Sequence, residues 1–338
     1  MLEKSFFNTK NINTWSAIGS RATYGLAMYE IAKKRDDIIV LTADVSTSAG
    51  LDRYRRDFPN KYLDIGIAEQ NMIGVAAGLA SENLHVFTTT FAPFQTARCL
   101  EQIKVNLGYM KQKVCMTGLA SGLVLGTLGY THCSIEDVGV LRSIPNISIV
   151  SPADSFETVK VLNSFFDYNQ SIYIRLTGGS PNPKIYNEDY EFKIGKGIIL
   201  SQGEDITIIS CGSSIKIALD VVNELKNQNK LNAKLINMHT IKPIDLEILN
   251  EINDKTKLVV TIEEHNIIGG LGSAVSEALS QINKKIKQIT IGHPDSYGKG
   301  GEYKFLLNKY GFSKESIIST IFKNLWVIIC LFISLAFP

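Results

Sequence analysis

The sequence predicts an α/β protein with two doubly wound domains, each built on a mainly parallel sheet. Short apolar runs of strand length alternate with segments of helical spacing about 10–15 residues long, which is typical of successive strand–helix–strand units. The chain has 338 residues, enough for two domains of ordinary size. A segment rich in Gly, Pro and charge, "GGSPNPKIYNEDYEF" (178–192), separates the two series of elements.

In the first series, apolar runs that read as strands are followed by segments with helical periodicity. The expected strands are 37–45, 62–68, 85–91, 113–120, 147–154 and 171–177. The expected helices are 20–35, 69–82, 92–108 and 155–168.

The second series repeats the alternation without a close sequence repeat. Its expected strands are 205–212, 233–240 and 257–264, and its expected helices are 213–229, 245–254 and 272–283. The predicted organisation is a domain over 1–180, a linker over 181–192, a second domain over 193–321 and an atypical apolar tail over 322–338.

Composition excludes some classes of protein. The net charge is +2, and no run of Lys and Arg suggests contact with a phosphate backbone, so a nucleic-acid partner is not expected. The five cysteines have no CxxC spacing, which argues against a disulfide framework and against a thiolate metal site. Reduced thiols and the lack of a secretory leader predict a cytoplasmic protein, and no metal ligands are expected in this chain.

The C-terminal tail is unusual because it is almost continuously apolar from Leu325 onward. It is shorter than the roughly 20 apolar residues that a bilayer-spanning helix needs. A tail anchor, a buried terminal segment and out-of-frame sequence are three alternatives; the last two are favoured, and no membrane partner is expected.

A glycine-rich turn at Gly270 to Gly272 invites comparison with dinucleotide-binding folds. The full fingerprint needs GxGxxG and an acid about 20 residues further on, but the third glycine is missing here and the downstream stretch is rich in Lys. Close packing of a helix N-terminus on a sheet is the favoured interpretation, and NAD is not expected. No P-loop motif is present.

Glu69 stands where an expected strand ends and a helix of small residues begins. An acid in the first turn of a helix is often an exposed residue that complements the helix dipole. The carboxyl ends of strands in α/β sheets are, however, where active sites lie. A carboxyl desolvated at this depth would share a proton with a ring nitrogen, so Glu69 is a candidate for proton chemistry.

Three further side chains follow neighbouring strands. Phe91 and Phe94 are three residues apart and lie on one side of a helical turn, where they form either core packing or a slot for a planar heterocycle. His132 lies in a loop with Gly126 and Gly129. It is a candidate general acid or base because imidazole exchanges protons near neutral pH, although single histidines are mostly structural.

Together these motifs resemble the thiamine-diphosphate enzymes of the transketolase group. The resemblance covers about residues 15–320 and rests on "DIGIAEQNMIGVAAGLA", "TTFAPF", "YTHCSIEDVGVLRSIPNISIVSPAD" and "TIKPIDLEIL…TIEEHNIIGGLGSAV", in this order. It implies that the first domain is a pyrimidine-binding domain and the second a transketolase C-terminal-type domain.

The resemblance also implies roles for single residues. Glu69 matches the glutamate that hydrogen-bonds the aminopyrimidine ring and activates the cofactor, and Phe91 and Phe94 match the aromatic residues around that ring. His132 matches a histidine beside the reacting carbon and the substrate. Asp44 matches an acid near the cofactor at the boundary between subunits.

Other matched positions concern the substrate. Arg21, Ser48 and Arg175 match residues that hold the phosphate of a sugar phosphate, for which arginine is suited by bidentate pairing.

This chain departs from the family pattern at three positions. Leu128 stands where the family has an acid that contacts the donor sugar, Ala120 where it has a phosphate-binding histidine, and Ala97 where it has a pyrimidine-side aromatic. The resemblance therefore implies intact cofactor activation and altered sugar recognition.

One family motif is missing. No GDG sequence occurs in this chain, although thiamine diphosphate is held through Mg²⁺ by GDG and a later Asn in a separate domain of the family. The resemblance therefore implies an N-terminal partner subunit that carries GDG…N and holds the Mg²⁺, in an α2β2 heterotetramer.

The expected function is the catalytic half of a two-chain transketolase that moves a two-carbon ketol unit between sugar phosphates. The alternatives are a subunit similar to 1-deoxyxylulose-5-phosphate synthase, a 2-oxoacid dehydrogenase beta-like subunit, and a non-catalytic interaction subunit.

Overall fold

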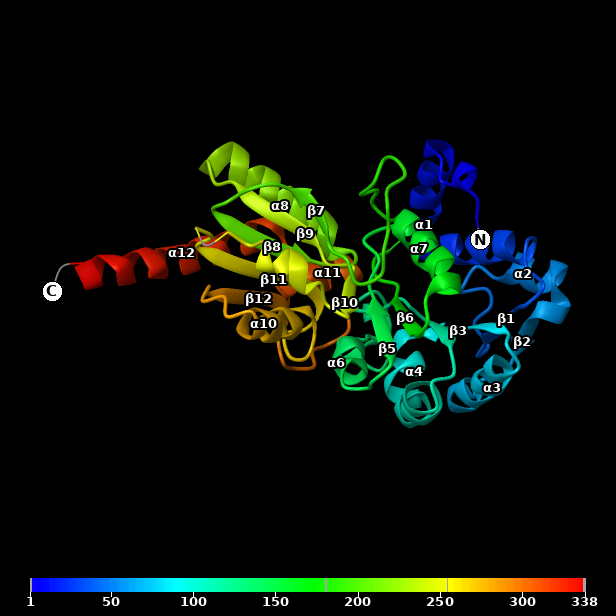
Figure 1. Cartoon of the computed structure of the whole chain (residues 1–338). Coiled ribbons are helices and arrows are strands. Elements are labelled where there is room, and N and C mark those ends of the chain that lie inside the picture. Colours follow the sequence, from blue (N-terminus) through cyan, green and yellow to red (C-terminus); the bar gives the residue numbers. More distant parts are fainter. Residues whose placement is uncertain (1, 180, 254, 337–338) are drawn as a thin grey trace.

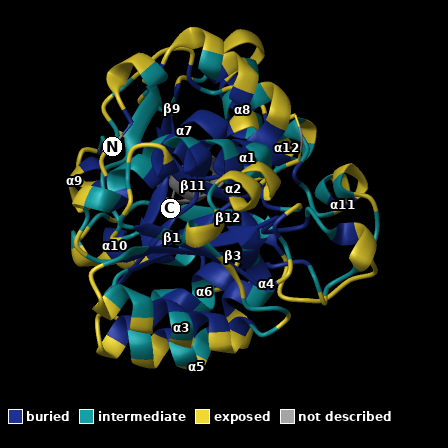
Figure 2. Ribbon diagram, turned by 90° about the vertical axis from the view of Figure 1, so that its right-hand side faces the viewer, coloured by how far each residue is buried: buried dark blue, intermediate teal, exposed yellow. Residues whose placement is uncertain are grey.

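The computed structural model describes the backbone of residues 2–179, 181–253 and 255–336, and the described side chains end at residue 326. It contains two α/β lobes side by side, with the N-terminal lobe on the right of Figure 1 and the C-terminal lobe on the left. In both lobes the strands form the buried centre and the exposed residues lie on the outer helices and loops (Figure 2). The predicted α/β class with two mainly parallel sheets is confirmed.

The first sheet has seven strands in the order β10-β5-β6-β4-β3-β1-β2. Its strands are β1 (Ile38–Thr42), β2 (Tyr62–Asp64), β3 (His85–Phe91), β4 (Val114–Leu119), β5 (Ile147–Val150), β6 (Ser171–Arg175) and β10 (Thr240–Lys242). All pairs are parallel except that of β10 with β5. Each parallel step requires a crossover, which explains the alternation of strand and helix in the sequence.

Helices cover both faces of this sheet. On one face α1 (Thr9–Ala32) packs against α7 (Ser155–Ser164) in a core that includes Trp15 and Phe156. On the other face lie α3 (Glu69–Ser81) and α6 (Asp137–Arg142). The short helix α2 (Asp52–Asp57) lies against α1 at the end of the sheet.

The second sheet has five strands in the order β12-β11-β8-β9-β7. These are β7 (Ile198–Ser201), β8 (Ile206–Ser210), β9 (Ala233–Asn237), β11 (Leu258–Asn266) and β12 (Gln288–His293), of which only the edge strand β7 pairs antiparallel. One face carries α8 (Ser214–Asn229) and α12 (Lys314–Ala336), and the other carries α9 (Leu246–Asn250) and α10 (Leu271–Gln281). The short helix α11 (Tyr303–Lys309) lies where the two lobes meet (Figure 1).

The two lobes share structure in two ways. Strand β10 belongs to the C-terminal half of the chain but pairs with β5 of the first sheet, Thr240 opposite Val150. One apolar core also continues from the first sheet, with Val114 and Ile149, into the second, with Ile209 and Ile236.

The segment after β6 is coil. Two buried acids hold it in place, the N-cap residue of α7, Asp154, and Glu157 in the first turn of α7. The carboxylate of Asp154, the N-cap of α7, accepts the backbone N–H groups of Ile185 (2.8 Å) and Tyr186 (3.2 Å). Glu157 accepts hydrogen bonds from the hydroxyl of Tyr190 and the amide of Asn237 in β9. The polar residues between the domains therefore form an ordered contact.

The expected helix over 92–108 is broken in the structure. It consists of α4 (Ala92–Gln95), a 3₁₀ turn (Ala97–Cys99), α5 (Leu100–Gln102) and a π-helical segment (Ile103–Tyr109). The break is at Thr96, whose φ of −116° and ψ of −83° are not helical and whose hydroxyl donates to the carbonyl of Ala92. This local bond competes with the helix, and helical periodicity alone did not reveal it.

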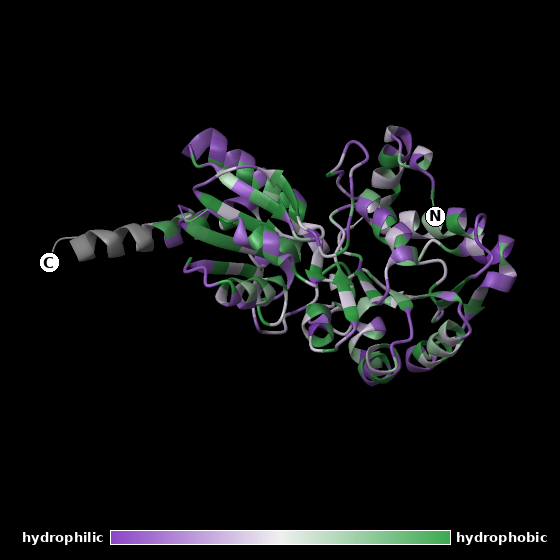
Figure 3. Cartoon of the chain, viewed as in Figure 1, coloured by the Kyte–Doolittle hydropathy of each residue, from purple (hydrophilic) through white to green (hydrophobic). Residues whose placement is uncertain are grey.

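The apolar tail begins within α12, whose side chains up to Leu325 pack on α8 and the second sheet. The ribbon of α12 then extends beyond the C-terminal lobe (Figure 1). Figure 3 shows that the strands of the second sheet are mostly hydrophobic. Within the described part of the chain, no helix is long and apolar enough to cross a membrane.

Candidate active site

The predicted site residues gather at one edge of the first sheet. Strands β1, β2, β3 and β4 are parallel neighbours, so their carboxyl ends lie at the same edge. Asp44 follows β1, Glu69 follows β2, Phe91 ends β3, and the loop with His132 follows β4. Ligands bind at this edge in open α/β sheets.

Glu69 is the first residue of α3, and its side chain is only 4% exposed. Its Oε1 accepts a hydrogen bond of 2.7 Å from Nη1 of Arg98. Among the described residues, the carboxylate of Glu69 accepts no other hydrogen bond, and its second oxygen remains available to a ligand. A nearly buried carboxylate with one free oxygen can hold or share a proton with a bound ring.

Arg98 was missed by the sequence analysis. Its guanidinium carbon lies 3.9 Å from the ring centroid of Phe94, so one cation contacts both the acid and the aromatic of the site. The available signal was an arginine four residues after Phe94, a spacing that places two side chains side by side on a helix, but no spacing linked Arg98 to Glu69. The break at Thr96 turns Arg98 back toward Glu69.

The aromatic residues connect Glu69 to His132. The rings of Phe91 and Phe94 are 6.4 Å apart and edge-on, and the ring of Phe94 lies 5.3 Å from the imidazole of His132, also edge-on. Nδ1 of His132 lies 3.0 Å from the hydroxyl of Thr131. The half-buried His132 therefore presents Nε2 as the ring nitrogen without a hydrogen bond in the described chain.

Asp44 is exposed and adopts a left-handed backbone conformation with φ of 56°. Its backbone N–H donates to Oδ1 of Asp64, 3.0 Å away, and this bond fixes the turn after β1. The structure thus places Asp44 at the site edge, with its carboxylate outside the contacts that join Glu69, Phe94 and His132.

Arg21 and Ser48 line one cavity of about 260 Å³, together with Gly178 and Gly179. A kink in α1 at Gly19, where φ is 82°, opens the helix here. Two segments distant in sequence, 18–22 and 47–50, thereby meet at a polar surface that could take an anion.

Arg175 does not reach this cavity. Its side chain is buried, its Nε donates to both carboxylate oxygens of Asp137 (2.8 and 3.0 Å), and its Nη2 donates to the carbonyls of Ser134 (3.1 Å) and Glu264 (2.9 Å). A guanidinium occupied in this way joins the two domains, and the geometry favours this structural role over the expected phosphate contact.

The three departures from the family pattern have different surroundings. Leu128 is 57% exposed on the loop that carries His132. Ala97 is exposed beside Arg98, and Ala120 is buried with φ of 52° at the start of the loop. In the described residues, no group of three His, Cys, Asp or Glu side chains could hold a metal ion.

The glycine-rich turn before α10 is occupied by a side chain of the same domain. The two carboxylate oxygens of Glu263 accept the N–H groups of Leu271 (2.6 Å) and Gly272 (2.7 Å). A Cβ atom on Gly270 would lie 2.1 Å from Oε2 of Glu263, so the glycine makes room for this carboxylate. This contact supports the packing interpretation of the turn.

Comparison with known proteins agrees with the fold. Residues 16–181 match the transketolase pyrimidine-binding domain, and residues 195–317 match the transketolase C-terminal domain. Fold and site thus define a chain with the pyrimidine-side half of a thiamine-enzyme architecture.

Several relatives are chains of similar length. The sequence is 37% identical over 308 residues to a putative transketolase C-terminal section of Methanocaldococcus jannaschii, covering 91% of this chain and 96% of that protein. It is 35% identical to one of the subunits of the apulose-4-phosphate transketolase of Phocaeicola vulgatus, covering 90% of this chain and 96% of that protein.

A solved structure described as a split-gene transketolase in an inactive β4 tetramer superposes with a TM-score of 0.83 at 35% identity, covering 91% of this chain and 98% of that one. The chain belongs to the transketolase family, and its relatives include subunits of split enzymes.

Proposed function

We propose that this chain is the catalytic half of a two-chain transketolase, which uses thiamine diphosphate to transfer a two-carbon ketol unit between sugar phosphates. We also propose that the enzyme acts in the cytoplasm. The observation that carries the proposal is the meeting of a nearly buried carboxyl, two phenylalanine rings and a histidine at one sheet edge.

The residues present fit the pyrimidine half of the cofactor. The free oxygen of Glu69 would hold a proton at a ring nitrogen, while Phe91 and Phe94 would flank the ring and exclude water. When bound, the cofactor supplies a carbon nucleophile for the sugar carbonyl. His132 would move a proton at the substrate hydroxyl or carbonyl oxygen, and Arg21 and Ser48 would bind the sugar phosphate.

The diphosphate half of the cofactor requires a partner. The sequence contains no GDG motif, so we infer that an N-terminal subunit with GDG…N supplies the Mg²⁺ ligands, in an α2β2 assembly. The similarity to a transketolase C-terminal section over 96% of its length supports this division of labour.

The substrate is proposed to be a sugar phosphate that differs from the ordinary donor. The exposed side chain of Leu128 and the methyl of Ala120 replace polar groups at the sugar positions. Relatives at 35% identity carry names that refer to apulose 4-phosphate and to 6-deoxy-6-sulfofructose, both modified sugars.

Co-expression with a GDG…N subunit tests the proposal. We expect a stable complex that moves a ketol unit from xylulose 5-phosphate, or from a modified ketose phosphate, to aldose phosphate acceptors, measured by mass spectrometry of the products. A complex that binds thiamine diphosphate but transfers no ketol unit from any donor would contradict it.

A second function is supported by similarity to 1-deoxy-D-xylulose-5-phosphate synthases, such as the Caldanaerobacter subterraneus enzyme at 32% identity, of which this chain spans 48%. In that case the same complex would use pyruvate as the donor and release carbon dioxide. Measuring carbon dioxide from labelled pyruvate distinguishes the two functions.

A further inference from the structure

The loop that carries His132, residues 120–135, leaves the first sheet and is held by the second domain. Glu264 and Asn266 lie in β11, and Gly301 precedes α11. The backbone contacts across the domain boundary are Leu123 N to Glu264 Oε1 (2.6 Å), Gly301 N to Gly126 O (2.9 Å) and Asn266 N to Ile135 O (2.7 Å). These bonds fix the start, middle and end of the loop.

Glu264 anchors the start of the loop from a buried position. Its carboxylate also accepts hydrogen bonds from the hydroxyls of Ser213 (3.0 Å) and Tyr303 (2.7 Å), and burial raises the pKa of this carboxyl above its ordinary value. The Arg175 guanidinium donates to the carbonyl of Glu264 and to that of Ser134 in the loop. The contact is therefore built from several directions.

The middle of the loop approaches α11 closely. A Cβ atom on Gly126 would lie 2.3 Å from Cδ1 of Leu306 and 2.6 Å from the carbonyl oxygen of Gly301. Leu123 and Cys133 of the loop share a small core with Leu306. No side chain fits between the loop and the second domain at this point.

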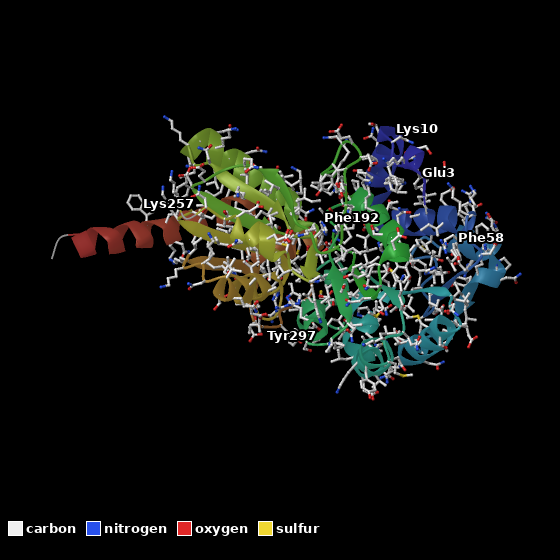
Figure 4. All side chains as sticks on the ribbon, viewed as in Figure 1. Glu3, Lys10, Phe58, Phe192, Lys257 and Tyr297 are labelled. Atoms are coloured by element: carbon white, nitrogen blue, oxygen red, sulfur yellow. The ribbon has the colours of Figure 1, made fainter. Side chains whose placement is uncertain are left out.

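Tyr130, two residues before His132, makes a polar side-chain contact across this boundary. Its hydroxyl lies 2.6 Å from Nε2 of His293, the last residue of β12, and 3.0 Å from the hydroxyl of Tyr310. The ring of Tyr297 lies edge-on to Tyr130 at 5.6 Å, and Figure 4 shows Tyr297 near the junction of the lobes.

The direction of the Tyr130–His293 bond follows from the imidazole. Burial lowers the pKa of His293, so the ring is neutral near pH 7 and carries one proton. Nδ1 lies 2.7 Å from the carbonyl oxygen of Pro294, which can only accept, so the proton is on Nδ1. Nε2 is therefore an acceptor for the Tyr130 hydroxyl, whose single proton is shared between Nε2 and the Tyr310 hydroxyl.

We propose that Tyr130 and His293 are positioning residues, through which the second domain sets the position of His132 against Phe94. The expected effect on turnover rests on the proposed function of His132, whereas the expected effect on the order of the loop does not. A purely structural alternative is that the pair only adds stability to the domain boundary.

The first test measures the loop without catalysis. Amide hydrogen exchange of the full chain is followed by mass spectrometry for wild type, Tyr130→Phe and Tyr297→Phe. Tyr297 is 74% exposed, so the second variant removes a neighbouring tyrosine hydroxyl outside the proposed contact. We expect peptides within 123–135 to exchange about fivefold faster in Tyr130→Phe only, because the part-buried hydrogen bonds of this hydroxyl to His293 and Tyr310 are lost.

The second test measures turnover in the co-expressed complex. Tyr130→Phe is expected to lower kcat about tenfold with KM for the sugar phosphate within about twofold, because small displacements of a catalytic group reduce the rate strongly. His293→Gln retains an amide that can accept the Tyr130 proton and should restore most of kcat, whereas His293→Leu should behave as Tyr130→Phe does.

The outcomes separate the two proposals. Equal loop exchange in wild type and Tyr130→Phe overturns the positioning role, and so does a His293→Leu complex with wild-type kcat. Faster loop exchange in a chain whose wild-type complex transfers no ketol unit leaves the loop contact intact and overturns the proposed function instead. Tyr130→Phe keeps the aromatic ring, so the test does not depend on the stability of the His293 variants.

Discussion

Each domain of this chain has a buried glutamate near the start of a helix, Glu69 as the first residue of α3 and Glu263 within β11 beside the first turn of α10, and the two carboxylates have different surroundings. Glu263 is 1% exposed, and each of its oxygens accepts a backbone N–H of α10. Glu69 is 4% exposed, but one side chain, Arg98, contacts one of its oxygens. Two buried glutamates beside helix N-termini thus differ, one carboxylate being fully used by the fold and the other still able to bind a ligand.

The comparison shows that burial alone does not identify a functional acid. The useful question is how many of its acceptor positions the chain itself occupies. Two backbone donors make Glu263 a capping residue, whereas Glu69 has unused capacity beside Phe94 and His132.

The largest effect is expected for Glu69→Ala. In the co-expressed complex this change should lower turnover about 10³-fold, which is typical of losing a proton-transfer group, while the complex still assembles. Steady-state ketol transfer and size-exclusion chromatography measure the two properties. Wild-type turnover in Glu69→Ala would remove the basis for the functional half of the comparison.

Glu263→Ala should affect stability instead. Loss of two charge-assisted hydrogen bonds at the start of α10 should lower the free energy of unfolding by about 4 kcal/mol. Urea denaturation followed by circular dichroism measures this loss. A variant as stable as wild type would mean that the amides of Leu271 and Gly272 find other acceptors, and the comparison would fail on its structural side.

A third acid, Asp154, tests whether backbone donors keep a buried carboxyl ionised. Burial raises its pKa from 3.8 to about 6, although Glu157, Ile185 and Tyr186 donate backbone N–H groups to it. Between these two values the folded state binds a proton that the unfolded state does not. The resulting stabilisation is complete below about pH 4 and is lost as the pH rises through 6.

The measurement is the free energy of unfolding of wild type relative to Asp154→Asn at several pH values. As the pH falls from 7 to 4, we expect the free energy of unfolding of wild type to rise by up to about 3 kcal/mol relative to that of Asp154→Asn. A difference that stays constant with pH would show that the backbone donors outweigh burial at Asp154.

The smallest effect is expected for Arg98→Ala. Arg98 is 42% exposed, so its ion pair with Glu69 is screened by solvent and should contribute about 1 kcal/mol to the free energy of unfolding. Arg98→Lys, which keeps the charge but not the planar contact with Phe94, is the matched control. A loss as large as that in Glu263→Ala would mean that Glu69 serves the fold to the same extent as Glu263.

The sequence predicted local structure well where pattern and packing agree. The alternation of strands and helices in 37–91 and 205–283 is present in the structure, and its strands are buried between helices except for the exposed edge strand β2. The short strand β10 and the edge strands β7 and β12 were missed, because runs of three to six residues carry little periodic signal.

For the site, the sequence identified residues but not their partners. The contact of Arg98 with Glu69 spans 29 residues, and that of Arg175 with Asp137 spans 38, so spacing could not show either. The first pairing adds a residue to the site, and the second places an expected phosphate ligand inside the protein. The assignment of Glu69, Phe91, Phe94, His132, Asp44, Arg21 and Ser48 to catalysis and binding stays a prediction, and Glu69→Ala tests its first member.

The antiparallel pairing of β10 with β5 has a consequence for anyone who wants to express the domains separately. A fragment that ends at residue 192 would lack the strand that covers β5, and its first sheet would gain a bare edge of unpaired backbone groups. Such edges recruit strands from other molecules, so this fragment should aggregate. Extending the fragment to residue 243 would restore the strand but would also import an incomplete second sheet, so the covalent chain from α1 to α12 is the smallest practical unit of expression.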